Sequence, residues 1–416
     1  CRYDPFKDRE RDCSMQMETF LSQCFYVAGA YDDDADFSRL HDRLQTTSAQ
    51  PADRVVYMAV PPSVFLTAAQ GIAGSGLAAQ HDERWARVVL EKPFGHDSDS
   101  SQQLTDALAE LFDDEQLYRI DHYLGKEVIQ NLLVLRFANT ILQPIWNRDY
   151  IKHVEITFAE KIGCEGRAGY FDSSGIIRDV IQNHLLQILA LIAMEPPVAM
   201  TADEIAEEKA KVLRAVQPPT LQDTVLGQYV AGDHGPAYRD DPDVPDDSRT
   251  ETYAEIGLQL HNARWAGVPF VLRAGKALNA QETTICVKFR PPPHRLFPAT
   301  PEHCDNDLHI RVQPDEAIEL HLANRVPGFD NQVQMSKLDM LYHQAFDQVL
   351  PDAYERLLLD VIRGDRRLFI QPRELDASWR VVTPLLQAMA EHGVQPEPYA
   401  FGSAGPDRNA QPQDHA

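Results

Sequence analysis

The sequence lacks any apolar run of 18 residues, the length that a membrane-spanning helix requires. Its most apolar stretch, Leu185–Met194, is too short to cross a bilayer and is typical of a buried helix. Basic residues are also scarce, because 39 Lys and Arg stand against 63 Asp and Glu and give a net charge of −24. This balance argues against general nucleic-acid binding, which needs a basic surface. We therefore expect neither nucleic acid nor membrane as a partner.

Cysteine is sparse and forms no pattern. The six cysteines are scattered, without a CxxC pair or the spacing of metal ligands. We expect free thiols in a reducing compartment, the cytoplasm, rather than a disulfide framework, and no bound metal. The chain also lacks an initial Met, and the residues after Cys1 contain no apolar segment of a signal peptide. We therefore expect a processed chain or a piece of a longer protein, and the sequence leaves organellar targeting open.

The first part of the chain alternates short apolar runs with helical patterns. Continuous apolar runs such as Val55–Val60 and Arg87–Leu90 are typical of strands that are buried on both faces. Alternation of strands and helices predicts a parallel α/β sheet. We expect a polar helix within residues 1–22, strands at 25–31, 55–60 and 87–90, and helices at 36–44, 64–73 and 98–111.

The pattern changes near residue 121. Beyond it, most apolar segments alternate with polar residues and follow one another without helices, which favours an antiparallel sheet. The fold class is therefore α/β plus α+β, with one domain at 1–121 and a second at 122–416, of which 403–416 is expected to be disordered. Strands are expected at 153–158, 269–273, 284–289, 308–312 and 317–322, and helices at 127–137, 178–194, 353–362 and 374–389.

Three segments carry polar residues at the ends of predicted elements. The first, Glu91-Lys92-Pro93-Phe94-Gly95, follows a buried strand. Lys92 would lie at the carboxyl end of a parallel strand, where open α/β sheets bind ligands, and the proline keeps it out of helical geometry. For this segment alone, an ordinary turn lysine is an equally favoured alternative.

The second segment runs from Arg119 to Glu127, directly before a predicted helix. His122, Tyr123 and Lys126 supply three donors beside a helix N-terminus, whose free N–H groups and positive dipole end attract phosphate. The alternative is a capped helix start with solvated charges, which would be favoured if the segment stood alone.

The third segment, Arg178–Gln187, opens a helix that is apolar nearly all round and must be buried. Polar residues in its first turns, Asp179 and His184 among them, therefore lie in or beside the core, where they need partners or a function. A lone helix histidine is more often a satisfied core residue than a catalyst. The two other segments favour a functional histidine here.

In combination, the three segments resemble the glucose-6-phosphate dehydrogenase family. The resemblance runs from about residue 25 to about residue 400, and its stretch at 119–127 is highly specific. It implies oxidation of D-glucose 6-phosphate to 6-phospho-D-glucono-1,5-lactone with hydride transfer to NADP, the first step of the oxidative pentose phosphate pathway. Further matches lie at 165–167, 169–172, 268–270, 273–278, 311–314 and 351–357.

The family's functional residues carry over by position. His184 matches the general base that takes the proton of the C1 hydroxyl, and Asp121 matches the carboxylate that orients this histidine. The resemblance also implies a homodimer or homotetramer, with an outer sheet face apolar enough to form the interface. Substrate contacts are implied for Lys92, His122, Tyr123, Lys126, Glu160, Asp179, Lys276 and Gln313, and cofactor contacts for Lys92, Pro61, Pro62 and Phe65.

One feature of the family is missing. No predicted strand is followed by the Gly-rich turn and helix that bind the cofactor pyrophosphate, since the glycines of 71–76 follow a helix. We therefore expect an incomplete Rossmann-type, NADP-binding parallel-sheet domain, followed by a larger domain with a mostly antiparallel sheet covered by helices. The chain as written is expected to bind glucose 6-phosphate weakly and to reduce NADP hardly at all. Two alternatives remain: a non-catalytic sugar-phosphate-binding or oligomer-partner relative, and a dehydrogenase with a broader hexose-6-phosphate range.

Overall fold

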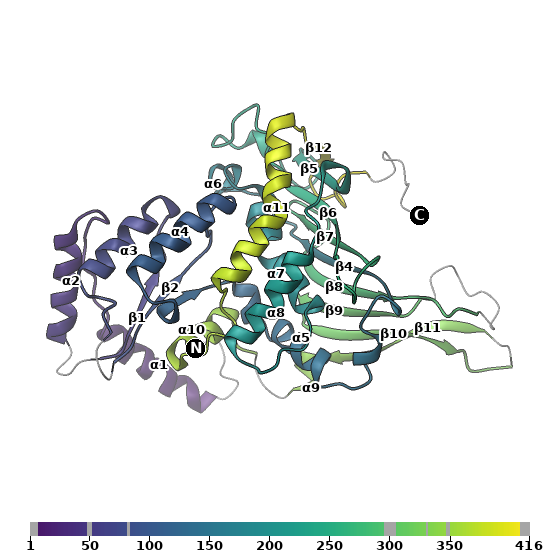
Figure 1. The fold of residues 1–416 in the computed structure, drawn as a ribbon, viewed down its shortest axis with the longest axis horizontal. Helices are drawn as coiled ribbons and strands as arrows, with labels where there is room; N and C mark the ends of the chain where they lie inside the picture. Colours follow the sequence, from purple (N-terminus) through teal and green to yellow (C-terminus); the bar gives the residue numbers. More distant parts are fainter. Residues whose placement is uncertain are drawn as a thin grey trace. The chain divides into compact units, whose positions relative to one another are not determined.

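The chain forms two compact units in the computed structural model, whose elements are labelled in Figure 1. The first unit comprises Cys1–Leu90, Asp106–Tyr118 and Asp347–Pro351, and the second comprises Glu91–Thr105, Arg119–Phe346 and Asp352–Ala416. Among the described residues, no helix is long and apolar enough to cross a membrane. The structure describes residues 7–47, 52–80, 84–294, 305–329, 332–346 and 350–407, with the backbone alone for 7–14.

The first unit is built around a small sheet in the order β1-β2-β3. β1 and β2 are parallel, with Val56 opposite Val88. The middle strand is apolar and buried, as a strand covered on both faces must be. This confirms the α/β class of this part. The strands are β1 (Arg54–Met58), β2 (Ala86–Leu90) and β3 (Leu117–Arg119), and the helices are α1 (Lys7–Ser22), α2 (Asp34–Thr47) and α3 (Phe65–Gly74). Helix α4 (Ser98–Leu111) belongs to the second unit up to Thr105 and to the first unit from Asp106.

The strand expected at 25–31 is wrong. Residues 24–30 have no regular secondary structure, and most of their side chains are exposed, Tyr26 at 89%. No strand of the described residues pairs with this segment, and side chains of α2 take the place of strand partners: Asp36 accepts from the backbone N–H of Ala30, and Arg39 donates to the backbone oxygen of Ala28. Its aromatic and β-branched residues, which are typical of strands, do not form one without a neighbouring strand.

The second unit contains a mixed, mostly antiparallel sheet in the order β11-β10-β9-β8-β4-β7-β6-β5-β12. In the described part of the chain, only two pairings of this sheet, β4 with β7 and β5 with β12, are parallel. This confirms the α+β class of the larger domain. The strands are β4 (Ile151–Ala159), β5 (Thr224–Val230), β6 (Tyr253–Gln259), β7 (Pro269–Gly275), β8 (Glu282–Phe289), β9 (Asp307–Gln313), β10 (Ala317–Arg325), β11 (Val333–Leu341) and β12 (Glu397–Ala400).

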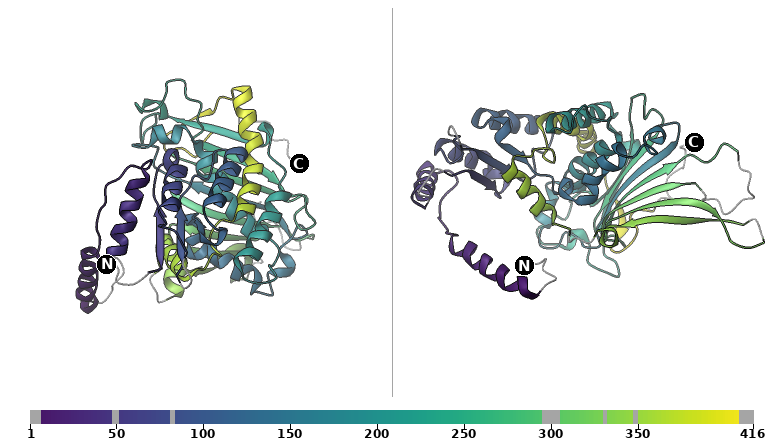
Figure 2. Two further views of the ribbon diagram at one scale, coloured as in Figure 1. Left: turned by 60° about the vertical axis from the view of Figure 1, so that its left-hand side comes forward. Right: turned by 90° about the horizontal axis from the view of Figure 1, so that it is seen from below.

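Helices α5, α7, α8 and α11 lie together on one face of this sheet (Figure 2). The helix expected at 178–194 is present, but its first half, Ile177–Leu185, is π-helical, and only Leu186–Ala193 is α-helical. All eight residues of that second half are buried. The helices are α5 (Glu127–Phe137), α6 (Ala168–Asp172), α7 (Leu186–Ala193), α8 (Ala202–Ala215), α9 (Tyr342–Ala345), α10 (Ala353–Arg363) and α11 (Pro372–His392), with short 3₁₀ turns at 62–64, 114–116, 122–125, 143–145, 221–223 and 238–240.

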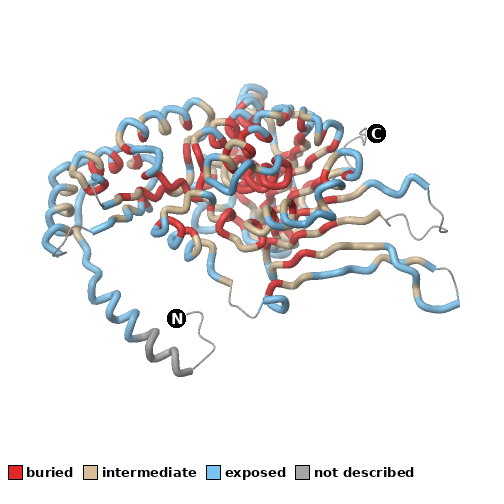
Figure 3. Tube along the Cα trace, turned by 60° about the horizontal axis from the view of Figure 1, so that its bottom comes forward, coloured by how far each residue is buried: buried red, intermediate tan, exposed pale blue. Residues whose placement is uncertain are grey.

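The core of the second unit lies between these helices and the sheet. Alternation along each strand places one set of side chains against the helices. Val154, Ile285 and Ile310 on neighbouring strands are fully buried on this face. Figure 3 shows the buried residues concentrated here, while the outer part of β10 and β11 is exposed.

The opposite face of the sheet, which we call the open face, is polar. It carries Glu155, Arg273, Cys286, His309 and Glu319, which alternate along their strands with the buried residues. The expectation of an apolar outer face is therefore wrong. The sequence alternates cleanly because this face is hydrophilic, and the same alternation that predicts an antiparallel sheet argues against an apolar second face.

The expected disorder of 403–416 is wrong for residues 403–407. The carbonyl oxygen of Ser403 accepts a hydrogen bond from the backbone N–H of Asn279, and Ser403 forms a bridge with Leu278. These backbone bonds hold a segment that has no apolar periodicity of its own. Residues 408–416 lie outside the described residues.

Candidate active site

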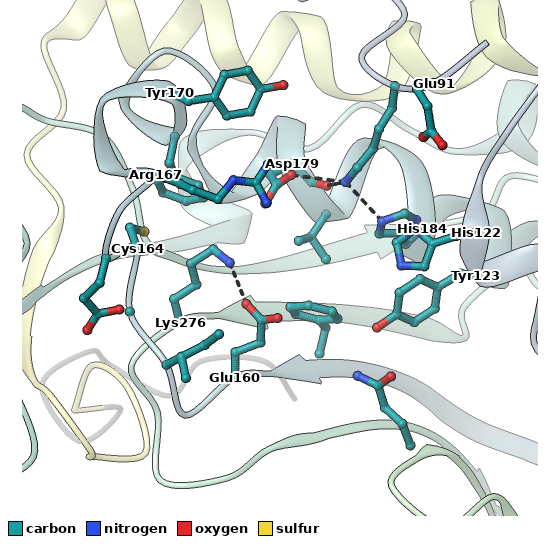
Figure 4. A pocket seen from close by; sticks show the side chains of 18 of the residues that line it. Glu91, His122, Tyr123, Glu160, Cys164, Arg167, Tyr170, Asp179, His184 and Lys276 are labelled. Atoms are coloured by element: carbon teal, nitrogen blue, oxygen red, sulfur yellow. Dashed lines mark hydrogen bonds and ion pairs between the residues drawn. The ribbon is translucent and has the colours of Figure 1, made fainter. Parts of the chain in front are cut away.

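The second unit contains a cavity of about 790 Å³, large enough for a small-molecule ligand. Figure 4 shows charged and aromatic side chains that point into it from several elements. It is lined by Glu91, Lys92, His122, Tyr123, Phe158, Glu160, Ile162, Gly163, Cys164, Glu165, Arg167, Tyr170, Phe171, Asp179, Val180, His184, Lys276, Gln313 and Tyr354.

A buried pair, Asp121 and His184, lies at this cavity. Oδ1 of Asp121 is 2.5 Å from Nδ1 of His184, and the two side chains are only 1% and 3% exposed. Burial by itself raises the pKa of Asp121, but the charge and hydrogen bond of His184 outweigh it and lower that pKa to about 2. Asp121 is therefore ionised and accepts the Nδ1 proton, which leaves the lone pair of His184 on Nε2. The predicted meeting of these residues, 63 positions apart, is confirmed.

Local structure fixes both members of the pair. Asp121 precedes the 3₁₀ turn His122–Gly125, and its Oδ1 also accepts from the backbone N–H of Tyr123 at 2.9 Å. A Cβ at Gly125 would lie 2.5 Å from the carbonyl oxygen of Ala353, so the close approach of α10 requires glycine there. His184 lies in the π-helical segment, a conformation that often occurs at functional sites.

Lys92 reaches the free nitrogen of the histidine. Its Nζ is 3.2 Å from Nε2 of His184 and donates to the backbone oxygen of Asp179 at 2.7 Å and to its Oδ1 at 3.1 Å. Burial lowers the pKa of His184, Asp121 raises it and Lys92 lowers it, with a net shift downward. The imidazole is therefore neutral at neutral pH and can accept a proton at Nε2.

A second ion pair lies across the cavity (Figure 4). Nζ of Lys276 is 2.5 Å from Oε2 of Glu160. Burial works against the charge of Lys276, but Glu160 outweighs it and raises the pKa of Lys276. Burial likewise raises the pKa of Asp179, but Lys92 and Lys276 outweigh it and lower that pKa. Lys276 and Asp179 are thus charged, and each can exchange its present partner for a polar ligand.

Two rings complete the wall beside His184. The ring of His122 is edge-on to that of His184, with centroids 4.7 Å apart, and burial with the neighbouring His184 lowers the pKa of His122 to about 3. The hydroxyl of Tyr123 lies 3.1 Å from Oγ1 of Thr283, and burial raises the pKa of Tyr123. Both rings are therefore neutral and offer hydrogen bonds without charge.

The arrangement supports proton transfer from a bound hydroxyl. A neutral imidazole is oriented by a buried carboxylate, and two ammonium groups, Lys92 and Lys276, lie in the same cavity. Ammonium groups bind phosphate and carboxylate through charge-assisted hydrogen bonds. The cavity is thus suited to a hydroxylated, anionic small molecule.

Two family models match nearly the whole chain. Residues 3–131 match "Glucose-6-phosphate dehydrogenase, NAD binding domain", and residues 133–415 match "Glucose-6-phosphate dehydrogenase, C-terminal domain". This chain belongs to the glucose-6-phosphate dehydrogenase family.

Individual relatives agree with the family models. Glucose-6-phosphate 1-dehydrogenase 1, chloroplastic, of Arabidopsis thaliana is 47% identical over 408 residues, which are 96% of this chain and 70% of the relative. The glucose-6-phosphate 1-dehydrogenase of Dictyostelium discoideum is 46% identical over 395 residues, 93% of this chain and 79% of the relative. A solved glucose-6-phosphate dehydrogenase in complex with its substrate glucose-6-phosphate is 42% identical, with a TM-score of 0.86 over 92% of this chain and 80% of that chain.

Most residues predicted for a glucose-6-phosphate dehydrogenase site lie at the cavity. Asp121 is behind His184 rather than in the lining. Lys126 is not among the lining residues, and its Nζ lies 5.2 Å from the centroid of the Tyr123 ring. Pro61, Pro62 and Phe65 belong to the first unit. The predicted residues in the lining are Lys92, His122, Tyr123, Glu160, Asp179, His184, Lys276 and Gln313.

Sequence analysis assigned no role to eleven of the 19 lining residues, and four of these are Glu91, Arg167, Tyr170 and Tyr354. The ring of Tyr354 stacks on that of His122, with centroids 5.9 Å apart. All four lie in segments that match the family, so the signal was present, but the resemblance attached no role to them.

The described residues fit a nicotinamide dinucleotide only in part. Pro61 and Pro62 follow β1, at the carboxyl end of a parallel strand, where open α/β sheets bind such ligands, and Phe65 begins α3. The glycines of 71–76 do not form a phosphate-binding turn, because Gly71 lies within α3, where a Cβ would meet the ring of Phe37 at 2.3 Å. In the described part of the chain, no strand runs into a Gly-rich turn and helix. These residues therefore supply no pyrophosphate site.

Proposed function

We propose that this protein is a glucose-6-phosphate dehydrogenase, an oxidoreductase acting on a CH–OH donor. It oxidises D-glucose 6-phosphate at C1 to 6-phospho-D-glucono-1,5-lactone, with NADP as the hydride acceptor. The observation that carries the proposal is the buried Asp121–His184 pair, whose Nε2 faces a cavity that also contains Lys92 and Lys276. The family supports the choice of substrate.

His184 is the general base. Its Nε2 takes the proton of the C1 hydroxyl while the C1–H bond breaks and the C1–O bond gains double-bond character. Asp121 keeps the imidazole in the required tautomer and favours the imidazolium that forms. When bound, the nicotinamide ring supplies the hydride acceptor.

Lys92 has to leave Nε2 of His184 before the hydroxyl can approach. In the structure it donates to both His184 and Asp179, so it can move from the nitrogen to the substrate oxygen without losing its second partner. There its positive charge favours the loss of a proton from the hydroxyl. Lys92 thus acts on the bound sugar, and its place after β2 also fits a cofactor contact.

The remaining predicted residues recognise the sugar phosphate. His122 and Tyr123 on the 3₁₀ turn, with Lys126 at its end, supply donors for the phosphate. Glu160 and Asp179 accept hydrogen bonds from sugar hydroxyls, while Lys276 and Gln313 make further contacts.

Two measurements test the proposal. Isothermal titration should show binding of glucose 6-phosphate and none of glucose, because the phosphate interacts with the cations. Absorbance should show NADPH formation that requires glucose 6-phosphate and is lost in His184→Asn. NADP and NAD are both tested at high concentration, since the described residues lack a pyrophosphate site, and NADP is expected to be preferred.

Other results would change the assignment. Binding of glucose 6-phosphate without any reduction of either cofactor would support the non-catalytic sugar-phosphate binder instead. Equal turnover of mannose 6-phosphate and galactose 6-phosphate would support the broader hexose-6-phosphate range.

We also propose a homodimer or homotetramer, which analytical ultracentrifugation tests. Placement in the cytoplasm stays a prediction, because several plant relatives are named chloroplastic.

A further inference from the structure

Four side chains of the kinds that bind metals meet on the open face of the sheet. Cys286 lies on β8, Asp307 and His309 lie on β9, and His321 lies on β10. The register pairs Cys286 with His309 and Asp307 with His321 across neighbouring strands. Such cross-strand pairs have Cβ atoms about 4.5–5.5 Å apart, so three adjacent strands bring all four side chains into one patch.

The ligand atoms are already close to the spacing of a metal site. Nε2 of His309 is 3.4 Å from Sγ of Cys286 and 3.4 Å from Oδ1 of Asp307. Bonds of about 2.0–2.3 Å to a tetrahedral zinc ion place the ligand atoms roughly 3.3–3.8 Å apart. The candidate atoms of Asp307, His309 and His321 all lie within 4.8 Å of one another. Two side chains have to move. Cys286, whose Sγ contacts His309 but is not part of this set, moves inward, and His321 moves outward, because its Nδ1 now lies 2.6 Å from Oδ1 of Asp307.

We propose that Cys286, Asp307, His309 and His321 bind one Zn²⁺ ion per chain. The set of one sulfur, two nitrogens and one carboxylate oxygen suits a borderline-soft ion such as Zn²⁺ and is unsuited to Mg²⁺ or Ca²⁺, which take oxygen ligands. A thiolate and a carboxylate together balance the two charges of the ion.

Metal binding has to displace a proton. Burial raises the pKa of the Cys286 thiol to about 12, with Asp307 and Glu155 adding to this effect and Lys288 opposing it. Without metal the thiol keeps its proton. Zn²⁺ forms the Zn–S bond as the S–H bond breaks, and the proton passes to solvent, so binding is stronger at higher pH. The nearby charges on β10 and β11 are Glu319, whose Oε2 is 4.0 Å from Nε2 of His321, Lys337, which pairs with Glu319, and Asp339, which pairs with Lys337. Arg311 of β9 also pairs with Glu319.

The site is separate from the cavity and accessible to an ion. None of the four residues lines the catalytic cavity. The side chain of His309 is 39% exposed and that of His321 is 29% exposed, so an ion can reach them without opening the backbone. Sequence analysis predicted no metal because the ligands come from three strands and have no characteristic spacing along the chain.

Binding is tested with the metal alone. The purified protein is treated with a chelator, freed of it and titrated with Zn²⁺ by calorimetry, then with Co²⁺, whose visible bands report tetrahedral coordination. We expect one ion per chain and a thiolate-to-cobalt charge-transfer band. His309→Asn with His321→Asn should weaken binding by at least about tenfold, since even indirect partners of a metal cost 10–100-fold. Cys286→Ser should abolish the charge-transfer band.

Controls locate the ion. His392→Asn removes an exposed histidine of α11, whose Nδ1 contacts the backbone oxygen of Ala388, and should leave binding unchanged. Asp121, His122 and His184 form a second group able to hold a metal.

If the double variant binds Zn²⁺ as tightly as the unmodified protein, the ion lies elsewhere and the proposal is wrong. Absence of stoichiometric binding to the unmodified protein, or an unchanged Co²⁺ spectrum in Cys286→Ser, would also overturn it. The single Cys286→Ser variant decides the matter if circular dichroism shows that the double variant is unfolded.

Discussion

The second unit contains two Asp–His pairs with nearly the same hydrogen bond. Asp121 and His184 are 2.5 Å apart, and Asp307 and His321 are 2.6 Å apart. The first pair is 1% and 3% exposed, whereas the second is 14% and 29% exposed. The same two residue types thus form a base-and-orienter pair in the cavity and a candidate metal site on the open face.

Surroundings, rather than the hydrogen bond, distinguish the pairs. The cavity pair is enclosed by the 3₁₀ turn and the π-helical segment, and Lys92 approaches the free nitrogen of His184. The open-face pair has a thiol and a second histidine as neighbours and is open to water and ions. A buried pair can hold one proton in one place, while an exposed pair can exchange its proton for a cation.

The largest expected difference is in turnover. His184→Asn should lower kcat by about 10²–10⁴-fold, the range that a general base contributes, while the affinity for glucose 6-phosphate stays within about twofold. His321→Asn on the open face should leave both quantities unchanged in metal-free buffer. Steady-state kinetics and calorimetry measure the two effects. If His184→Asn kept more than about a tenth of the turnover, the assignment of the base would be wrong.

Removal of the aspartate should likewise lower kcat for the cavity pair and leave kcat unchanged for the open-face pair. Asp121→Asn removes the acceptor that fixes the tautomer of His184, so kcat should fall by about 10²-fold, toward the lower end of the range for the base. Asp307→Asn, its counterpart on the open face, should change Zn²⁺ affinity and leave kcat alone. Comparable kcat losses in both variants would mean that Asp121 has only a structural role.

The sequence predicts the catalytic pair in the cavity, but it does not predict the cluster on the open face. Local signals, namely hydrophobic periodicity and the stretch at 119–127, predicted helix α5, strands β4 and β7–β10 and the catalytic residues. Strands β5 and β12 were not predicted, since β5 is buried along most of its length without a clean alternation and β12 has only four residues. Pairing between strands brings Cys286, Asp307 and His321 together, so no linear motif marks that cluster.

Removal of the lysine from an ion pair should raise the KM for glucose 6-phosphate in the cavity but not on the open face. Lys276→Met removes a charge that pairs with Glu160 in the cavity, and a lost charge-assisted hydrogen bond of about 1.5–3 kcal/mol should raise the KM for glucose 6-phosphate roughly 10–100-fold. Lys337→Met removes one of the partners of Glu319 on the open face and should leave that KM unchanged. A KM within twofold of the unmodified enzyme in Lys276→Met would exclude this lysine from substrate binding.

The smallest expected effect is a shift in pH dependence. Burial lowers the pKa of His184, Asp121 raises it and Lys92 lowers it, so removing the charge of Lys92 should raise that pKa. Because the base must be unprotonated in the free enzyme, where Lys92 contacts it, the acid limb of the kcat/KM profile in Lys92→Met should move to higher pH. The variant should therefore lose most activity at low pH relative to its own plateau. Lys152→Met, which removes an exposed lysine of β4, should leave the limb in place. The phosphate of the substrate titrates alike in both enzymes, so the difference between their limbs belongs to the base. A limb that stays fixed in Lys92→Met, or moves to lower pH, would show that Lys92 does not act on His184.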